Sequence, residues 1–103
     1  MKGNGDCYQV AGNLIVDIND DKAFLCHGTA TGQGPIVGIK HGHAWVELGD
    51  KVIDKSNGNN LCMDKDVYYR IGKIENVKRY SRKEAISNLI KTEHFGPWRN
   101  KNE

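Results

Sequence analysis

Residues 42–54 constrain the fold more than any other part of the chain, because a strictly alternating segment leads there into a short turn signal. One face of the predicted strand carries apolar side chains, and the other carries His43 and Trp45. Gly49-Asp50 then favours a two-residue hairpin turn, with glycine at its first central position. Such a turn fixes the register, places Trp45 opposite Asp54, and puts Asp54 on the face that carries His43.

A helix is predicted from Cys7 to Asp17, because apolar residues recur there at the spacing of one helical face. Asp6 stands at the N-cap and Gln9 follows three positions later, which is the spacing of a capping box. Gly12 either weakens this helix or lets another element pack closely. The other predicted elements are strands over 23–31, 51–54 and 77–80, a turn over 32–35, a short strand or irregular connection over 36–39, a short helical or extended piece over 64–71, and a helix over 81–93 that opens with a capping box of Ser81 and Glu84.

The length of 103 residues predicts a single domain over 1–103, with 96–103 as a loose tail after Gly96-Pro97. The sequence contains neither an apolar run near the ~20 residues of a membrane span nor the pattern of a signal peptide. Three cysteines, an odd number, favour reduced thiols. We therefore expect a cytoplasmic protein without membrane contact, or one in the host cytoplasm if it is phage-encoded.

Charge is distributed unevenly along the chain. Residues 1–64 carry five Lys and eight Asp or Glu, whereas residues 65–103 carry ten Lys or Arg and five Asp or Glu. Mixed charges of this kind typically form a solvated helix face. The alternative use of the basic C-terminal third is a contact surface for a protein partner, and the pattern does not favour nucleic acid.

Three residues in this pattern point to cysteine chemistry. Cys7 is predicted at the start of a helix, where unpaired N–H groups and the helix dipole favour a thiolate. His43 lies on a strand, and Asp54 lies beside it across the hairpin. A thiol that attacks, an imidazole that moves the proton and a carboxylate that orients the imidazole form a nucleophilic triad. The alternative for Cys7 is a buried core cysteine, which is common.

Other residues are assigned to supporting roles around this predicted site. The backbone N–H of Cys7, with Asn4 or Gln9 as a side-chain donor, is expected to stabilise an oxyanion. Tyr8, His41 and Trp45 are expected to contact the substrate. Glu47 is expected to be a surface or supporting group.

A metal site is the competing interpretation of the histidines. His41 and His43 form a His-x-His pair on one strand face, and Cys26, His27 or Cys62 would complete the ligand set. The tight cysteine spacing typical of zinc sites is missing. We therefore assign no metal ligands and no cofactor, and interpret His27 as structural.

The sequence also resembles the papain-like and transglutaminase-like superfamily of cysteine enzymes. Gly5-x-Cys7-x-x-x-Ala11 is similar to the nucleophile helix of transglutaminase-like proteins. His43-Ala44-Trp45-Val46-Glu47 and the later Val52-Ile53-Asp54 are similar to their histidine and aspartate strands. NlpC/P60-type hydrolases share this plan and its small size.

The resemblance implies an α+β fold of the papain-like class, with a Cys-bearing N-terminal helix packed on an antiparallel sheet and a helix at the C-terminal end. It implies Cys7 as nucleophile, His43 as general base and acid, and Asp54 as the orienting carboxylate. The expected function is a thiol-dependent amide hydrolase or acyltransferase that acts on a peptide or amide-bearing substrate through a thioester. The alternatives are a noncatalytic binding or inhibitor protein on the same fold and a metal-binding module built on His41 and His43.

Overall fold

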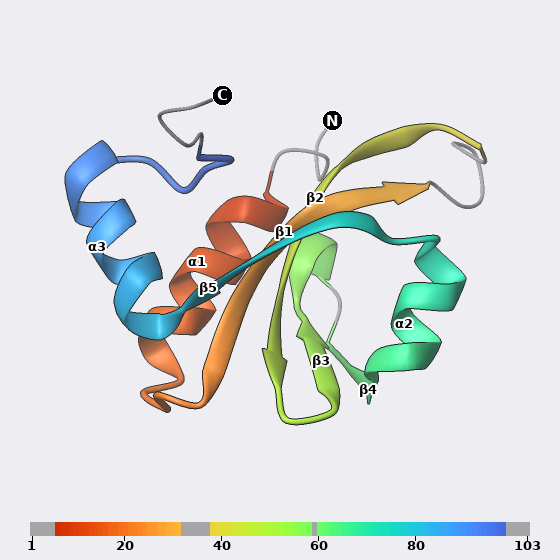
Figure 1. Ribbon diagram of the computed structural model, residues 1–103, viewed down its shortest axis with the longest axis horizontal. Coiled ribbons are helices and arrows are strands. Elements are labelled where there is room, and N and C mark those ends of the chain that lie inside the picture. Colours follow the sequence, from red (N-terminus) through yellow and green to blue (C-terminus); the bar gives the residue numbers. More distant parts are fainter. Residues whose placement is uncertain (1–5, 32–37, 59, 99–103) are drawn as a thin grey trace.

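The computed structural model describes residues 6–31, 38–58 and 60–98 of the chain, and these form an α+β domain (Figure 1). An antiparallel sheet of five strands and three α-helices make up the described part. In chain order the elements are α1 (Cys7–Asp17), β1 (Ala23–Thr31), β2 (Lys40–Leu48), β3 (Lys51–Asp54), the short 3₁₀-helix η2 (Ser56–Gly58), β4 (Leu61–Asp64), α2 (Lys65–Gly72), β5 (Glu75–Ser81) and α3 (Arg82–Thr92).

The sheet has the strand order β4-β3-β2-β1-β5, and every neighbouring pair is antiparallel. The predicted two-residue turn at Gly49-Asp50 is confirmed, because Leu48 pairs with Lys51 and Val46 pairs with Ile53. Gly49 has a φ of +63°, a conformation that glycine adopts at little cost. The register of the hairpin is therefore the one that the sequence predicts.

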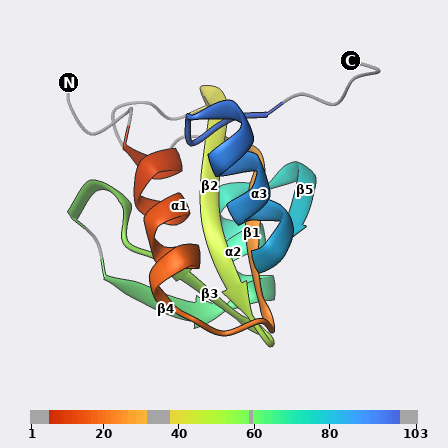
Figure 2. The ribbon, with the colours of Figure 1, turned by 90° about the vertical axis from the view of Figure 1, so that its left-hand side faces the viewer.

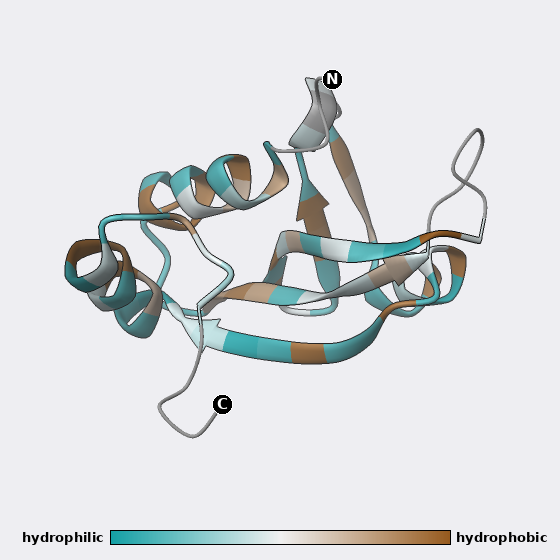
Figure 3. Cartoon of the chain, turned by 90° about the horizontal axis from the view of Figure 1, so that it is seen from above, coloured by the Kyte–Doolittle hydropathy of each residue, from teal (hydrophilic) through white to brown (hydrophobic). Residues whose placement is uncertain are grey.

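The helices cover both faces of the sheet. Helices α1 and α3 lie together on one face, and α2 lies on the other (Figures 1 and 2). The larger core lies under α1 and α3, and its buried residues are Ala11, Ile15, Ala23, Leu25, Ala44, Val46, Ala85 and Trp98. The smaller core lies under α2 and contains Cys26, Trp45, Val52 and Tyr68. Residues of opposite hydropathy follow one another along the strands (Figure 3), as expected for a sheet whose faces differ.

The bounds predicted for α1 are confirmed, but its predicted capping box is wrong. Asp6 occupies the N-cap position, yet its side chain makes no capping hydrogen bond. Its backbone is already helical, with φ −96° and ψ −11°, whereas a capping side chain needs an extended backbone to reach back to the first turn. Ser81 has that extended backbone and forms the predicted capping box with Glu84 at the start of α3.

The C-terminal segment packs more tightly than the sequence predicts. The prediction of a loose tail over 96–103 is wrong for residues 96–98, which the structure describes, because Trp98 is 7% exposed and belongs to the larger core. Phe95 packs against Gly12 of α1, where an added Cβ would lie 2.6 Å from the Phe95 ring. The glycine in the helix therefore permits a close approach, as one interpretation of the sequence anticipated.

Two further differences concern local structure. Strand β4 was not predicted, because its four residues alternate weakly and follow a polar loop. The turn expected over 32–35 and the first two residues of the expected connection over 36–39 lie outside the described residues. No helix in the described ranges is long and apolar enough to cross a membrane.

Candidate functional site

Asp54, the last residue of β3, is the centre of a buried cluster of hydrogen bonds. Its Oδ1 accepts hydrogen bonds from the Ser56 backbone N–H at 2.9 Å and from the Ser56 hydroxyl at 2.6 Å. Its Oδ2 accepts one from the Tyr68 hydroxyl at 2.7 Å and lies 3.2 Å from His43 Nε2. Four donors thus match the four acceptor positions of an ionised carboxylate.

Tyr68 determines which nitrogen of His43 carries the proton that faces Asp54. The single hydroxyl proton of Tyr68 is donated to Asp54 Oδ2. The Tyr68 oxygen also lies 2.8 Å from His43 Nε2, so it accepts a hydrogen bond there. Nε2 therefore carries a proton, and Nδ1 is the nitrogen left for a partner on the other side of the ring.

Cys7 is the candidate for that side, because its side chain is among the hydrogen-bonding and charged groups that raise the pKa of His43. It is the first residue of α1, so the unpaired N–H groups of the helix start surround it. Both groups are well shielded: Cys7 is 4% exposed, and the His43 side chain is 15% exposed. The structure thus brings the three predicted triad residues together in the order thiol, imidazole, carboxylate.

The ionisation of His43 and Asp54 follows from these contacts. Burial lowers the pKa of His43, but the hydrogen bonds and charges of Asp54 and Cys7 outweigh it and raise that pKa to about 9. Burial likewise raises the pKa of Asp54, but hydrogen bonds from His43, Ser56 and Tyr68 hold it well below its usual range. An imidazolium next to a carboxylate is therefore the stable form at neutral pH.

Trp45 supports the site from beneath, which corrects its predicted role in substrate binding. It is 1% exposed, so no substrate reaches it from solvent. Its ring stacks on His43 with centroids 5.8 Å apart and planes 29° apart, and Tyr68 lies against His43 at 6.4 Å and 23°. The reason for the error is that α2 covers the face of the sheet on which Trp45 lies.

Four other residues were predicted for the site, as oxyanion donors or substrate contacts. Asn4 lies outside the described residues, and Gln9 has an exposed side chain in the first turn of α1. Tyr8 is half-buried, with its hydroxyl against Gly42 of β2. His41 is half-buried near the site, with its ring centroid 5.9 Å from that of His43. His41 therefore lies beside His43, and Tyr8 lies against β2 one residue away from it.

Glu47 was expected at the surface or in a supporting position, and it is 2% exposed. Its Oε2 accepts hydrogen bonds from Trp45 Nε1 at 3.0 Å and from the Tyr69 hydroxyl at 2.5 Å. Its Oε1 accepts one from Arg79 Nε at 3.0 Å. Burial raises the pKa of Glu47, but these three donors outweigh it and hold that pKa below its usual range. Glu47 therefore fixes the orientation of the Trp45 ring.

The alternative metal site is not assembled in the described part of the chain, where no three His, Cys, Asp or Glu side chains are placed to hold an ion. Cys26 and His27 are adjacent in β1 and point to opposite faces of the sheet, each in a different buried environment. Cys62 is exposed on β4 at the edge of the sheet. His43 Nε2 is already occupied by Asp54 and Tyr68.

Sequence reasoning missed Tyr68 and Ser56. Ser56 follows Asp54 by two positions, and a hydroxyl at this spacing commonly closes a local turn on an aspartate, so a signal was present. Tyr68 carried no such signal, because its contact with Asp54 depends on how α2 packs across the sheet.

None of the protein-family models, curated proteins and solved structures compared with this chain matches it.

Proposed function

We propose that this chain is a thiol-dependent amide hydrolase or acyltransferase, with Cys7 as nucleophile, His43 as proton carrier and Asp54 as the group that orients His43. The observation that carries the proposal is the position of His43, which lies 3.2 Å from Asp54 and whose pKa is raised by both Asp54 and Cys7. His43 is largely buried, and a buried ion pair lowers stability unless its geometry is good. A purely structural histidine at this position would not need both Asp54 and Cys7 as partners.

The proposed reaction has two steps. The Cys7 sulfur attacks the carbonyl carbon of an amide, and the imidazolium of His43 gives its Nδ1 proton to the leaving amine as the C–N bond breaks. The products of this step are a thioester on Cys7 and a free amine. Water or a second amine then attacks the thioester, neutral His43 accepts its proton, and the Cys7 thiolate is released. Asp54 and Tyr68 keep Nε2 protonated throughout.

We further propose that the fold belongs to the papain-like class. What supports this is the order of the parts: a helix that begins at the cysteine, a strand that carries the histidine, and the next strand that carries the aspartate. Helix α1 also packs directly on the sheet that contains both strands, as the resemblance implies.

Acyl trapping tests the proposal directly. The protein is incubated with p-nitrophenyl acetate, which acylates a nucleophilic thiol and releases p-nitrophenolate, and the intact mass is then measured. One acetyl group on Cys7, together with hydrolysis of amide substrates, is the expected result. Cys7→Ala should abolish the adduct, and Cys62→Ser, which removes an exposed thiol outside the site, should leave it unchanged. An adduct on Cys62 alone contradicts the assignment.

The low exposure of Cys7 favours a second candidate, a noncatalytic binding protein in which this cysteine is structural. Limited iodoacetamide labelling near pH 6 separates the two, because few ordinary exposed thiols are ionised there. A nucleophilic Cys7 should react before Cys62 despite its burial. Labelling of Cys62 first, with Cys7 inert until the protein unfolds, supports the noncatalytic candidate.

A further inference from the structure

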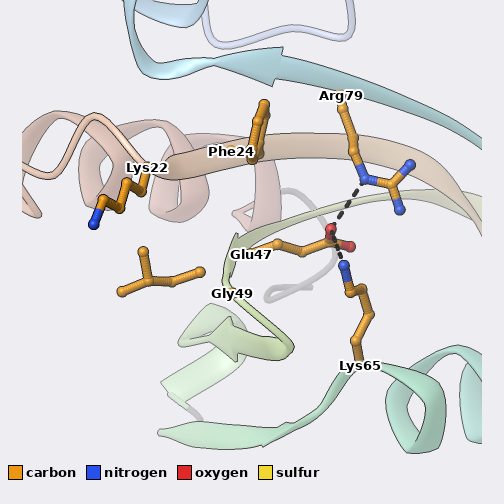
Figure 4. A pocket seen from close by; sticks show the side chains of 7 residues that line it. Lys22, Phe24, Glu47, Gly49, Lys65 and Arg79 are labelled. Atoms are coloured by element: carbon orange, nitrogen blue, oxygen red, sulfur yellow. Dashed lines mark hydrogen bonds and ion pairs between the residues drawn. The ribbon is translucent and has the colours of Figure 1, made fainter.

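A second candidate binding site lies on the face of the sheet that carries α2. It is a hollow of about 480 Å³ beside the turn between β2 and β3 (Figure 4). Phe24 and Glu47, which are cross-strand partners in β1 and β2, contribute to its wall. The lining residues are Lys22, Phe24, Glu47, Leu48, Gly49, Lys65 and Arg79. None of them belongs to the Cys7 site, and Trp45 lies between Glu47 and His43 along β2.

Glu47 holds two cations at the wall of this hollow. Its Oε1 lies 3.0 Å from Arg79 Nε and 3.6 Å from Lys65 Nζ (Figure 4). Its Oε2 is fixed from behind by Trp45 and Tyr69. Because the carboxylate is buried and hydrogen bonded on both oxygens, it acts as a rigid counter-ion for the two cations rather than as an acceptor for a ligand.

The two cations retain donors that Glu47 does not use. Arg79 gives Nε to Glu47 and Nη2 to the Tyr69 hydroxyl at 2.8 Å, and a guanidinium has five N–H donors in all. Lys65 Nζ lies beyond hydrogen-bonding distance of Glu47, so it contributes charge there. With Lys22 at the opposite end, three cations face one carboxylate, which gives the lining a net charge of +2 (Figure 4).

An apolar surface adjoins these cations. Phe24 is 41% exposed, which is unusual for a phenylalanine in a sheet, whereas the Leu48 side chain packs against the larger core on the other face. We propose that this hollow binds a carboxylate attached to an apolar group, with the carboxylate at Arg79 and Lys65 and the apolar group on Phe24. A preorganised guanidinium favours a carboxylate because the two match in shape. A free carboxylic acid and the C-terminus of a peptide share this chemistry.

A matched ligand series tests both halves of the proposal by NMR titration of the labelled protein. We expect saturable shifts at Phe24, Leu48 and Gly49 with 3-phenylpropionate. Binding of 3-phenylpropanamide, which lacks the charge, and of acetate, which lacks the ring, should be at least about tenfold weaker. N-acetylphenylalanine and its amide distinguish the two sources: binding of the former as tight as that of 3-phenylpropionate identifies a peptide C-terminus, and weaker binding identifies a free acid.

Variants make the test specific to the hollow. Lys65→Gln should weaken binding of 3-phenylpropionate about threefold, as expected for a half-exposed charge. Phe24→Ser should weaken it further, and Lys83→Gln on exposed α3 serves as the control. All titrations use the Cys7→Ala background, so that the outcome does not depend on the proposed enzyme activity. Equal binding of acid and amide, no saturation, or an unchanged affinity in both hollow variants overturns the proposal.

Discussion

The hydroxyl of Tyr68 donates a 2.7 Å hydrogen bond to Asp54, and this contact joins α2 to the end of β3. The same oxygen lies 2.8 Å from His43 Nε2. Tyr68 therefore donates to the Asp54 carboxylate and accepts from His43 Nε2, so that Nε2 carries a proton. The site consists of Cys7, His43, Asp54 and Tyr68, and its geometry depends on α2, which lies on the opposite face of the sheet from α1.

Tyr68→Phe should weaken the site without removing any group that reacts with substrate. Asp54 loses one of its four donors, and His43 Nε2 loses an acceptor, so the ring is held less firmly. We expect the rate of acyl transfer to fall about 10- to 100-fold and the free energy of unfolding to fall by about 1–2 kcal/mol. Steady-state kinetics and chemical denaturation measure the two effects.

Tyr69→Phe is the matched control, since Tyr69 is the next residue of α2 and bonds Glu47 instead of Asp54. It should lower stability by a similar amount and leave the rate within about threefold of that of the parent. Equal rate losses in the two variants would show that the tyrosines act only through stability.

Asp54→Asn should impair both the reaction and the fold. The aspartate accepts four hydrogen bonds, two on each oxygen. An asparagine side chain has only one oxygen. Its NH₂ group would therefore face the donors of Ser56, or those of Tyr68 and His43, and lose those hydrogen bonds. We expect a rate loss on the order of 10²–10⁴ and a stability loss of about 1–3 kcal/mol. Kinetics at a fixed fraction of folded protein separates the two.

Asp64→Asn tests whether the effect is specific, because Asp64 pairs with Lys51 at the surface and lies far along β4 from the site. Its rate should match that of the parent. A parental rate in Asp54→Asn would mean that Cys7 and His43 act as a pair without a third member.

The pKa of His43, raised to about 9, predicts an alkaline limit to the reaction. Below about pH 9 the ring keeps the proton that the leaving amine needs, and above it that proton is lost. The same raised pKa contributes stability that is fully present below pH 6.5 and is lost as the pH rises through about 9. The stability should therefore decline mainly between pH 6.5 and 9, and the rate of amide cleavage should decline between pH 8 and 10.

Asp54→Asn should move this alkaline limit to lower pH, since the carboxylate is a main cause of the raised pKa of His43. NMR titration of the His43 ring protons gives the same pKa without any substrate. A limit that stays near pH 9 in Asp54→Asn would assign it to a different group.

The contact between His43 and Asp54 could be predicted from the sequence because it is local. A two-residue turn sets the hairpin register, and the register alone decides that both residues share a face. The alternation also predicted correctly that Trp45 and Val46 point to opposite faces. It did not show that a helix covers each face, so the burial of Trp45 was missed.

Contacts between distant segments could not be predicted in the same way. Tyr68 reaches Asp54 only after β4 and the start of α2 have folded back across the sheet. Trp98 enters the larger core from a segment that has no periodic pattern of its own. In both cases the sequence gives a side chain suited to burial, and only the packing of whole elements determines where it lies.

The last prediction concerns acid stability and the buried ring of His27. His27 is 5% exposed, and neither ring nitrogen has a hydrogen-bonding partner among the described residues. The rings of Tyr8, Tyr80 and Trp98 surround it at centroid distances of 4.9–5.2 Å. Burial, assisted by the charge of Lys78, lowers the pKa of His27 from 6.5 to about 4.

Between pH 6.5 and 4 the unfolded chain therefore binds a proton at His27 that the folded chain does not bind. Stability from this residue is complete above pH 6.5 and falls as the pH drops towards 4. At about 1.4 kcal/mol per unit of pKa, the loss amounts to about 3 kcal/mol. His43 and Asp54 add little to this slope. Near pH 4, His43 is protonated in both the folded and the unfolded chain. Asp54, with its lowered pKa, loses its contribution to stability mainly at more acidic pH.

Urea denaturation from pH 7 to pH 4 measures this slope, and His27→Leu should flatten it because leucine fills a similar apolar space without titrating. The variant should gain stability relative to the parent as the pH falls, and the difference in stability should stop changing with pH above pH 7. His94→Leu, which removes an exposed histidine near the C-terminal end, should keep the parental slope. An unchanged slope in His27→Leu would mean that protonated His27 forms a hydrogen bond to an acceptor in the folded protein, and that the rings of Tyr8, Tyr80 and Trp98 move to allow it.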